Sequence, residues 1–407
     1  MRAYLTILAL GALCGCSSSE VIVAHQVELA EPASPPDEAT LLDVGIVVFD
    51  PGVPKGEIDK ETLEKLIAQG VYVQIRRAES IQMAVELRDT LQKSAQWGSV
   101  WVTPKSSAAA DVTVTAKILE SNGYVARVAV DAYDASGREW LKKSYEVETA
   151  AAAYNRGRYG DVDAYGDLYN SIANDLGAVR AALPEEQARA LRTVAALRYA
   201  GELSPSAFEG YVARRDGAYV PLRLPARDDP LFDRTQRVRQ RERLFFETLD
   251  EYYEKLAVDA QAAYDGWREN SREVSLAIHD AQRGARWRTA LGIASLVGSL
   301  AYGGGGSPLV GQTMLLVGNE LLKMRQESIR EKQLYTAELT ELSQTFDGEI
   351  APLVIELAGV EHRLTGSAEA QYAEWAELLQ QQFLEETAPV ALSAEPPPSS
   401  ADTVPPR

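Results

Sequence analysis

The feature that most constrains the fold is a strict alternation of apolar and polar residues over 112–118. Its apolar members are Val112, Val114, Ala116 and Ile118, and its polar members are Thr113, Thr115 and Lys117. A period of two is typical of a strand with one face buried against a core. Asn122-Gly123 follows, and this pair favours a tight hairpin because both residues tolerate positive φ. The pattern therefore predicts an antiparallel pair, with Val125–Tyr133 as the returning strand.

The flanking residues extend this pair into a larger sheet. Ala84, Leu87 and Leu91 recur at helical spacing and predict an amphipathic helix over Arg77–Ser94. The short apolar run Val44–Phe49 is typical of a buried strand. The remaining predicted strands are Val100–Thr103 and, after a turn at Asp134–Gly137, Trp140–Val147. Residues 42–149 are thus expected to form a layered β-α-β-β-β-β domain, which makes the chain α+β.

The first residues are typical of a secretory leader. Arg2 precedes the apolar run Leu5–Leu13, which is too short to span a bilayer. The following Cys14-Gly15-Cys16 resembles the lipobox of bacterial lipoproteins. This resemblance implies removal of residues 1–15, a lipid on Cys16 and, because Ser17 follows, sorting to the periplasmic side of the outer membrane. The alternative is an ordinary signal peptide with two incidental cysteines.

Both ends of the mature chain have a composition typical of segments outside a packed core. Residues 17–40 are rich in Ser, Glu, Ala and Pro, so 16–41 is expected to be a lipidated tether that holds the first domain away from the bilayer. Pro389–Arg407 is rich in proline, so 388–407 is expected to be a disordered tail.

The predicted α/β domain also carries a family resemblance. Its leading strand ends in Phe49-Asp50-Pro51, and later strands carry Ala110-Asp111-Val112 and Asp134-Ala-Ser-Gly137. This order resembles a class of bacterial envelope lipoproteins that includes the curli-secretion channel lipoprotein, the Pel polysaccharide-export lipoprotein, transport-auxiliary lipoproteins and the amino-terminal domain of TolB. The likeness covers about a quarter of the chain and rests on the order of elements. It implies a part of an envelope assembly without catalytic residues.

The rest of the chain is expected to be mainly helical. Residues 150–229 are expected to form a helical connector. Within it, Ser204-Pro205 is typical of a helix start, and Arg214–Asp229 is expected to be a basic loop interrupted by prolines. Residues 230–350 predict two long helices in an antiparallel hairpin. Residues 351–387 predict a small β-hairpin and a final helix. The apolar face of that helix carries Tyr372, Trp375, Leu379 and Phe383.

The predicted tip of the helical hairpin, 289–319, contains no charged residue over 31 positions and holds 8 glycines. Ala290–Tyr302 is about 20 Å long as a helix, short of the roughly 30 Å hydrocarbon core of a bilayer. The candidates for close helix contact are Ala290, Ala294, Gly298, Gly311 and Gly318. Two interpretations stay open: contact with a membrane or with copies of the chain, and a buried helical pair in a soluble bundle.

A tyrosine-rich stretch is the other candidate surface. Tyr154, Tyr159 and Tyr165 lie among glycines and arginines, and tyrosine is favoured at interfaces because it buries a large area beside a polar tip. The stretch predicts a surface for a protein partner or a glycan. Packing of the linker against the sheet is an equal alternative.

Composition excludes several function classes. The chain has 407 residues, with 59 acidic against 41 basic residues and a net charge of −18, so a nucleic-acid partner is not expected. Only 2 cysteines and 3 histidines are present, which excludes a disulfide framework and gives no reason to expect a metal or a cofactor. No catalytic motif is recognised. Asp131, Asp134 and Ser136 fit a strand-joining turn better than a calcium loop.

These patterns predict a lipoprotein anchored in the outer membrane and facing the periplasm, acting as a non-catalytic scaffold or accessory subunit of an envelope assembly. Association with an envelope protein or with copies of the chain is expected. One alternative is a component that inserts into a membrane, or oligomerises, through the tip at 289–319. A more remote alternative is a cell-wall hydrolase.

Overall fold

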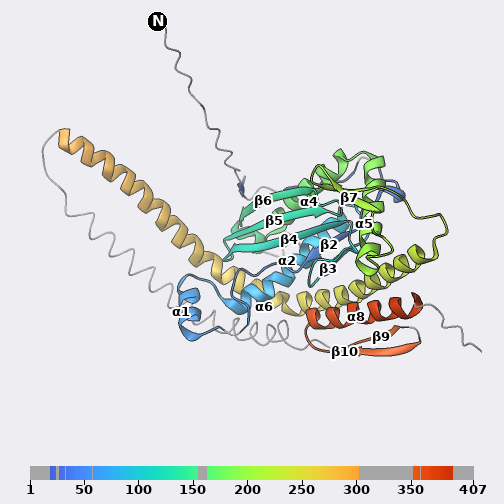
Figure 1. Cartoon of the computed structure of the whole chain (residues 1–407). Helices are drawn as coiled ribbons and strands as arrows, with labels where there is room; N and C mark the ends of the chain where they lie inside the picture. The colour runs from blue at the N-terminus through green and yellow to red at the C-terminus, as the bar shows by residue number, and fades with distance from the viewer. Residues whose placement is uncertain are drawn as a thin grey trace, which may run out of the picture.

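The centre of the molecule is a mixed sheet of six strands in the order β1-β6-β5-β4-β2-β3 (Figure 1). The structure is a computed structural model, and it describes residues 19–23, 27–154 except 33 and 57, 163–301, and 352–387 except 358. Strand β2 runs parallel to β3 and β4, β1 runs parallel to β6, and β4, β5 and β6 form an antiparallel meander. The strands are β1 (Ser19–Val23), β2 (Val44–Val47), β3 (Val100–Thr103), β4 (Val112–Ser121), β5 (Val125–Asp134) and β6 (Glu139–Glu148).

The predicted strand pair at the centre of the sheet is confirmed. Strands β4 and β5 pair with Val114 opposite Ala132, and the alternating apolar residues of β4 are buried. At the turn, the side-chain oxygen of Asn122 accepts hydrogen bonds from the backbone amides of Tyr124 and Val125, at 3.0 and 2.8 Å. Gly123 has a φ of +80°, which explains the need for glycine.

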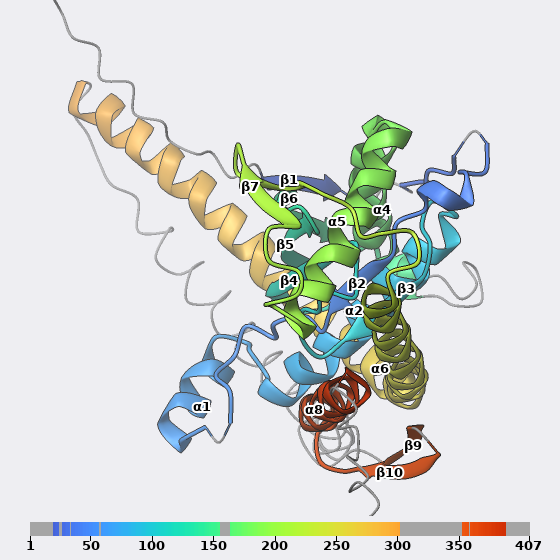
Figure 2. The same cartoon turned by 45° about the vertical axis from the view of Figure 1, so that its right-hand side comes forward.

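Helix α2 (Val73–Lys93) is the predicted helix of the α/β domain, but it is not amphipathic in the expected sense. Ala84, Leu87 and Leu91 pack into the main core under the sheet. The opposite side, with Ile75 and Ala78, packs against the long helix α6 (Pro230–Ala301). Because a second helix covers the side expected to face water, α2 is buried on both sides. A short helix, α1 (Lys60–Ala68), protrudes beside it (Figure 2).

Much of the expected tether is packed against the protein. Helices α4 (Gly166–Ala182) and α5 (Glu185–Leu203) follow the sheet, and α4 packs on β6 and α2. The segment 27–30 lies along α4. Asn170 Nδ2 donates to the Val27 carbonyl at 2.7 Å, and Asn174 Nδ2 donates to the Glu28 carbonyl at 2.9 Å. The expectation of a free tether is therefore wrong for these residues, which we call the strap, because regularly spaced amides on α4 hold their backbone. It is also wrong for Ser19–Val23, because this segment pairs with β6 as strand β1.

The region between α5 and α6 also differs from the prediction. Neither a helix at Ser204-Pro205 nor a plain loop is found, and a hairpin of β7 (Val212–Arg215) and β8 (Ala218–Pro221) takes their place. Asp216 and Gly217 form its turn with φ of +50° and +83°. Positive φ at both central positions is typical of a tight hairpin. The Asp216-Gly217 turn therefore favours a β-hairpin here, although the basic residues of the two strands had suggested a loop.

The C-terminal part has the predicted hairpin and helix, and it packs on α6. It consists of β9 (Leu353–Leu357), β10 (Val360–Leu364) and α8 (Ala368–Thr387). The predicted apolar face of α8 is buried, and the rings of Trp375 and Phe245 stack with centroids 5.8 Å apart. One continuous core includes Leu42 of the α/β domain and Phe383 of α8, so the boundaries drawn at 149, 229 and 350 do not separate distinct cores.

The fold class is confirmed at the level of a mixed sheet with helices, a long helix and a C-terminal hairpin and helix. The first arm of the predicted helical hairpin corresponds to α6, which extends past the sheet in both views (Figures 1 and 2). The second arm and most of the tip lie outside the described residues. Within the part of the chain that is described, no helix is long and apolar enough to cross a membrane.

Candidate functional site

Helix α6 is fixed to the α/β domain by buried ion pairs. Arg88 of α2 lies 2.7 Å from Asp250, and Arg239 of α6 lies 2.9 Å from Asp111 at the start of β4. Toward the other end, Arg268 lies 2.6 Å from Asp163 in the segment before α4. The three arginine side chains are at most 9% exposed. A buried ion pair is costly to break, because the remaining charge stays buried and unpaired. These pairs therefore fix the position of α6 along the domain.

A buried carboxyl group lies between α2 and α6. Glu79 of α2 is fully buried and accepts hydrogen bonds from Ser121 of β4 and, at 2.9 Å, from the hydroxyl of Tyr264 in α6. Burial raises the pKa of Glu79, although Arg76 opposes the shift. Desolvation favours the neutral form of a carboxyl group. Glu79 therefore links three elements as a hydrogen-bonding group of the interior, and nothing in its surroundings resembles an open catalytic site.

Two of the tyrosines predicted to form a partner surface, Tyr154 and Tyr165, pack against the turn at Gly123 instead. Tyr165 is fully buried, and its hydroxyl accepts a hydrogen bond from the amide of Gly123 at 3.1 Å. Tyr154 donates to the carbonyl of the same glycine at 2.5 Å, and burial raises the pKa of Tyr154 to about 12. The alternative of linker packing is thus correct for these two residues. Tyr159 lies outside the described residues.

The predicted contact residues of the tip divide between the described and undescribed parts of the chain. Ala290, Ala294 and Gly298 lie in the last turns of α6. Described contacts of α6 with the α/β domain reach His279, whose ring lies 5.3 Å from that of Tyr124, and the helix backbone continues from there to Ala301, about 33 Å at 1.5 Å per residue. Gly311, Gly318 and the lipid-attachment candidate Cys16 lie outside the described residues.

The turn considered as a calcium loop is held by its own residues. Asp134 accepts hydrogen bonds from the amide of Ser136 at 2.8 Å and from the indole nitrogen of Trp140 at 2.8 Å. The hydroxyl of Ser136 also donates to Asp134, at 2.5 Å. Over the described ranges, no group of three or more His, Cys, Asp or Glu side chains is placed to hold a metal ion. The carboxylate of Asp134 thus has a structural role.

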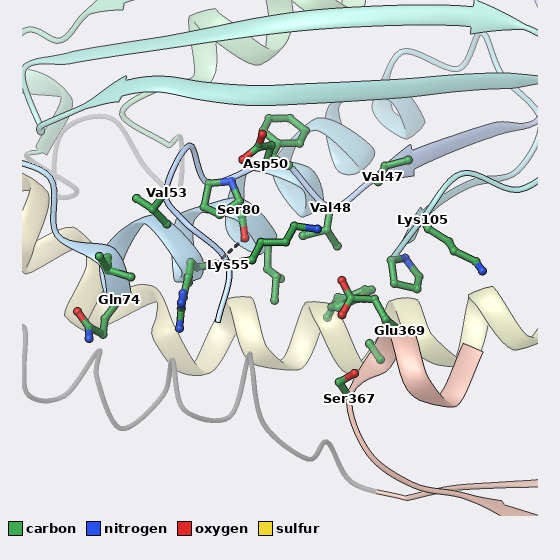
Figure 3. Close-up of a pocket in the computed structure, with 18 of the residues that line it drawn as sticks. Val47, Val48, Asp50, Val53, Lys55, Gln74, Ser80, Lys105, Ser367 and Glu369 are labelled. Atoms are coloured by element: carbon green, nitrogen blue, oxygen red, sulfur yellow. Dashed lines mark hydrogen bonds between the residues drawn. The ribbon is translucent and has the colours of Figure 1, made fainter. Parts of the chain in front are cut away.

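A cavity of about 1100 Å³ lies at the carboxyl ends of β2 and β3, between α1, α2, α6 and α8 (Figure 3). In parallel sheets this is the edge at which ligands usually bind. Its apolar walls include Val48, Val53, Ile58, Leu63, Ile81 and Leu256. Sequence reasoning missed this cavity, because its walls come from segments more than 300 residues apart. The one available signal was that two predicted strands end beside it.

The charged groups of this cavity include more basic than acidic side chains. Lys55, Arg77 and Lys105 line it together with Asp50 and Glu369. Lys117, which does not line the cavity, lies 3.4 Å from Asp50, and this half-exposed pair offsets part of the charge of that carboxylate. In Figure 3, Lys55 extends across the cavity toward Val48, and Glu369 points into it from α8. An excess of positive charge here is unusual in a chain with a net charge of −18.

The structure therefore offers two candidate sites. One is the end of α6 that extends beyond the α/β domain, and the other is the cavity at the ends of β2 and β3. Comparison of the chain with protein-family models, with curated proteins and with solved structures found no match. Its function has to be argued from the residues described above.

Proposed function

We propose that this chain is a lipid-anchored periplasmic scaffold, or an accessory subunit, of an envelope assembly, without a catalytic role of its own. The lipobox-like residues ending at Cys16 support the anchor and the location on the outer membrane. The order of strands over 42–149, which resembles that of envelope lipoproteins, supports the assembly role. Strand β1 adds a geometric constraint: Ser19, which pairs with Ser144 of β6, lies only three residues after Cys16, a reach of about 11 Å when fully extended.

The observation that carries this proposal is the extension of α6 beyond its ion-paired region. Residues 230–279 are held against the α/β domain and α8, so the following turns project from a fixed base. The projecting end includes 289–301, which contains no charged residue. An isolated apolar helix is marginal in water and gains stability by burying its surface against another one. We expect the covering surface to be an envelope protein or a second copy of this chain.

Photo-crosslinking in cells tests this proposal. A benzoylphenylalanine at Ala294 probes the projecting end, and one at Val258, which is 67% exposed on the packed part of α6, is the matched control. The scaffold function predicts a discrete protein adduct or a dimer at position 294 and none at position 258. Equal labelling at the two positions, or no protein adduct at either, would overturn it.

The same experiment addresses the alternative of membrane insertion. The uncharged residues 289–301 favour it, because charged side chains are costly in hydrocarbon. Insertion predicts adducts with lipid in place of protein at position 294. It also predicts that the protein without its acyl chain stays on membranes during an alkaline carbonate wash, and that Gly298→Glu releases it.

A further inference from the structure

The cavity at the ends of β2 and β3 is separate from α6's projecting end, and the proposed function does not use it. Its volume of about 1100 Å³ lies just above the usual range of about 300–1,000 Å³ for ligand sites. Its charged lining consists of three basic and two acidic side chains, and one of the acids is paired from outside. The hydroxyl of Tyr252 lines the same cavity and has no hydrogen-bond partner among the residues described. The cavity thus combines cationic groups, a donor and apolar walls.

Helix α1 forms a wall that is only loosely joined to the rest of the protein. Its residue Leu63 faces the cavity, whereas Ile67 on the same helix is 42% exposed. Gly56 and Gly70 flank the helix with φ of +77° and +78°, a conformation that favours glycine. Arg77 Nη2 donates to the Gly56 carbonyl at 2.9 Å and holds the start of this segment to α2. A short helix between two glycines, with few buried contacts, belongs to the low-stability part of a protein.

We propose that this cavity binds an amphiphilic anion, a single carboxylate or phosphate head group on an apolar chain, and that α1 closes over the bound chain. Lys55 contacts the head group from an exposed, flexible stem, and Lys105, whose Nζ lies 5.0 Å from the centroid of the Tyr372 ring, turns toward it. The apolar chain lies against Val48, Ile81 and Leu256. Burying a charged head group costs free energy unless an opposite charge lies close to it. Burial of the apolar chain contributes about 0.8 kcal/mol of binding free energy for each CH₂. Neither a simple anion nor a neutral alkane satisfies both halves of the site.

Calorimetry with the full mature chain and dodecanoate, kept below its micellar concentration, tests the proposal. We expect saturable binding of one dodecanoate. Acetate, which has the head group alone, and dodecyltrimethylammonium, which has the opposite charge, should bind at least tenfold more weakly. Dodecyl phosphate should bind like dodecanoate, and dodecanoate presented in phosphatidylcholine vesicles should be extracted by the protein if a bilayer is its source. Equal binding of the cationic surfactant would overturn the assignment.

A charge-removing variant gives the sharper test. Lys55→Met combined with Lys105→Met keeps the apolar stems and should weaken dodecanoate binding at least tenfold. Lys65→Met is the matched control, because Lys65 lies on α1, pairs with Glu61 at 2.7 Å and does not line the cavity. Hydrogen exchange of residues 58–69 should slow when dodecanoate binds. Unchanged affinity in the double variant, or unchanged exchange in α1 with ligand bound, would contradict the proposal.

Discussion

The guanidinium of Arg268 in α6 holds the carboxylate of Asp163 by two parallel hydrogen bonds, from Nη1 to Oδ1 at 2.9 Å and from Nη2 to Oδ2 at 2.6 Å. The arginine side chain is 1% exposed and the aspartate side chain is 5% exposed. Two bonds between planar groups fix orientation as well as distance. This pair therefore joins the segment before α4 to α6 in one geometry.

Breaking this pair should destabilise the protein strongly. Arg268→Met leaves Asp163 buried without its main partner, so the free energy of unfolding should fall by about 3–5 kcal/mol. Arg189→Met is the control, because Arg189 is half exposed and pairs with Glu185 at 2.8 Å on the surface of α5. It should change stability by less than about 1 kcal/mol. Urea unfolding followed by circular dichroism measures both, and similar losses would argue against the structural role of Arg268.

The stability of the protein should decrease as pH rises through the weakly acidic range. Burial, reinforced by Asp163 and Asp89, raises the pKa of Glu86 to about 7 from its ordinary 4.5. Because the folded state keeps a proton that the unfolded state releases, the contribution of Glu86 is fully present below pH 4.5 and is lost as pH rises to about 7. Burial raises the pKa of Glu79 as well, which acts in the same direction.

Glu86→Gln isolates this effect. The fall in the free energy of unfolding between pH 5 and pH 8 should become smaller by about 2 kcal/mol in this variant, because an amide cannot ionise. Glu64→Gln, an exposed change on α1, should leave the pH profile unchanged. A profile for Glu86→Gln that is parallel to that of the unaltered protein would refute the prediction.

Two glycines with the same backbone conformation separate steric contact from backbone strain. Gly123 has a φ of +80°, and a Cβ atom there would lie 2.0 Å from the carbonyl oxygen of Arg268. Gly217 has a φ of +83°, and nothing lies within 4 Å of its Cβ position. Gly217→Ala should cost about 1 kcal/mol of stability, and Gly123→Ala should cost at least about 2 kcal/mol more. If both variants lose the same free energy of unfolding in urea, the β4–β5 turn can move away from α6.

The strap should be released without unfolding the core. Asn170→Ala combined with Asn174→Ala removes the side chains that hold the Val27 and Glu28 carbonyls, at about 1 kcal/mol for each bond. We expect faster proteolysis within residues 27–37 and little change in the urea midpoint. Glu186→Ala on the exposed side of α5 is the control. Protection of 27–37 in the double variant would show that other contacts hold the strap.

The helices and strands that could be predicted are those whose hydrophobic periodicity or turn residues lie within one short stretch of sequence. The alternation in β4 with Asn122-Gly123 predicted the hairpin, and the spacing of Tyr372 and Trp375 predicted the buried face of α8. The strap was missed because residues 17–40, in which it lies, have the Ser-, Glu-, Ala- and Pro-rich composition of free segments, and the amides that hold it lie more than 140 residues away. The hairpin of β7 and β8 was missed because the decisive pair, Asp216-Gly217, lies among basic residues that favour a loop.

The candidate sites were less predictable, for the same physical reason. Tyr165 was expected on a surface, since its neighbours in sequence are polar, but its contacts are Gly123 and Arg268, which lie far from it along the chain. Lys55, Lys105 and Glu369 meet in one cavity only because α8 returns to the end of β2. The periodicity of a short stretch of sequence does not indicate which distant residues it will contact.

The enclosure of α2 between the sheet and α6 governs the order in which the chain can reach its native state. Glu79 and Tyr264 are hydrogen-bonded across 185 residues of sequence. As the chain is made from its amino terminus, the first α/β segment is complete long before the helix that covers Ile75 and Ala78 exists. Contacts between such distant residues form slowly, and a half-made chain presents an apolar flank to its neighbours. We therefore expect the newly made protein to be prone to aggregation until Trp267, the last residue of α6 in this cluster, has emerged.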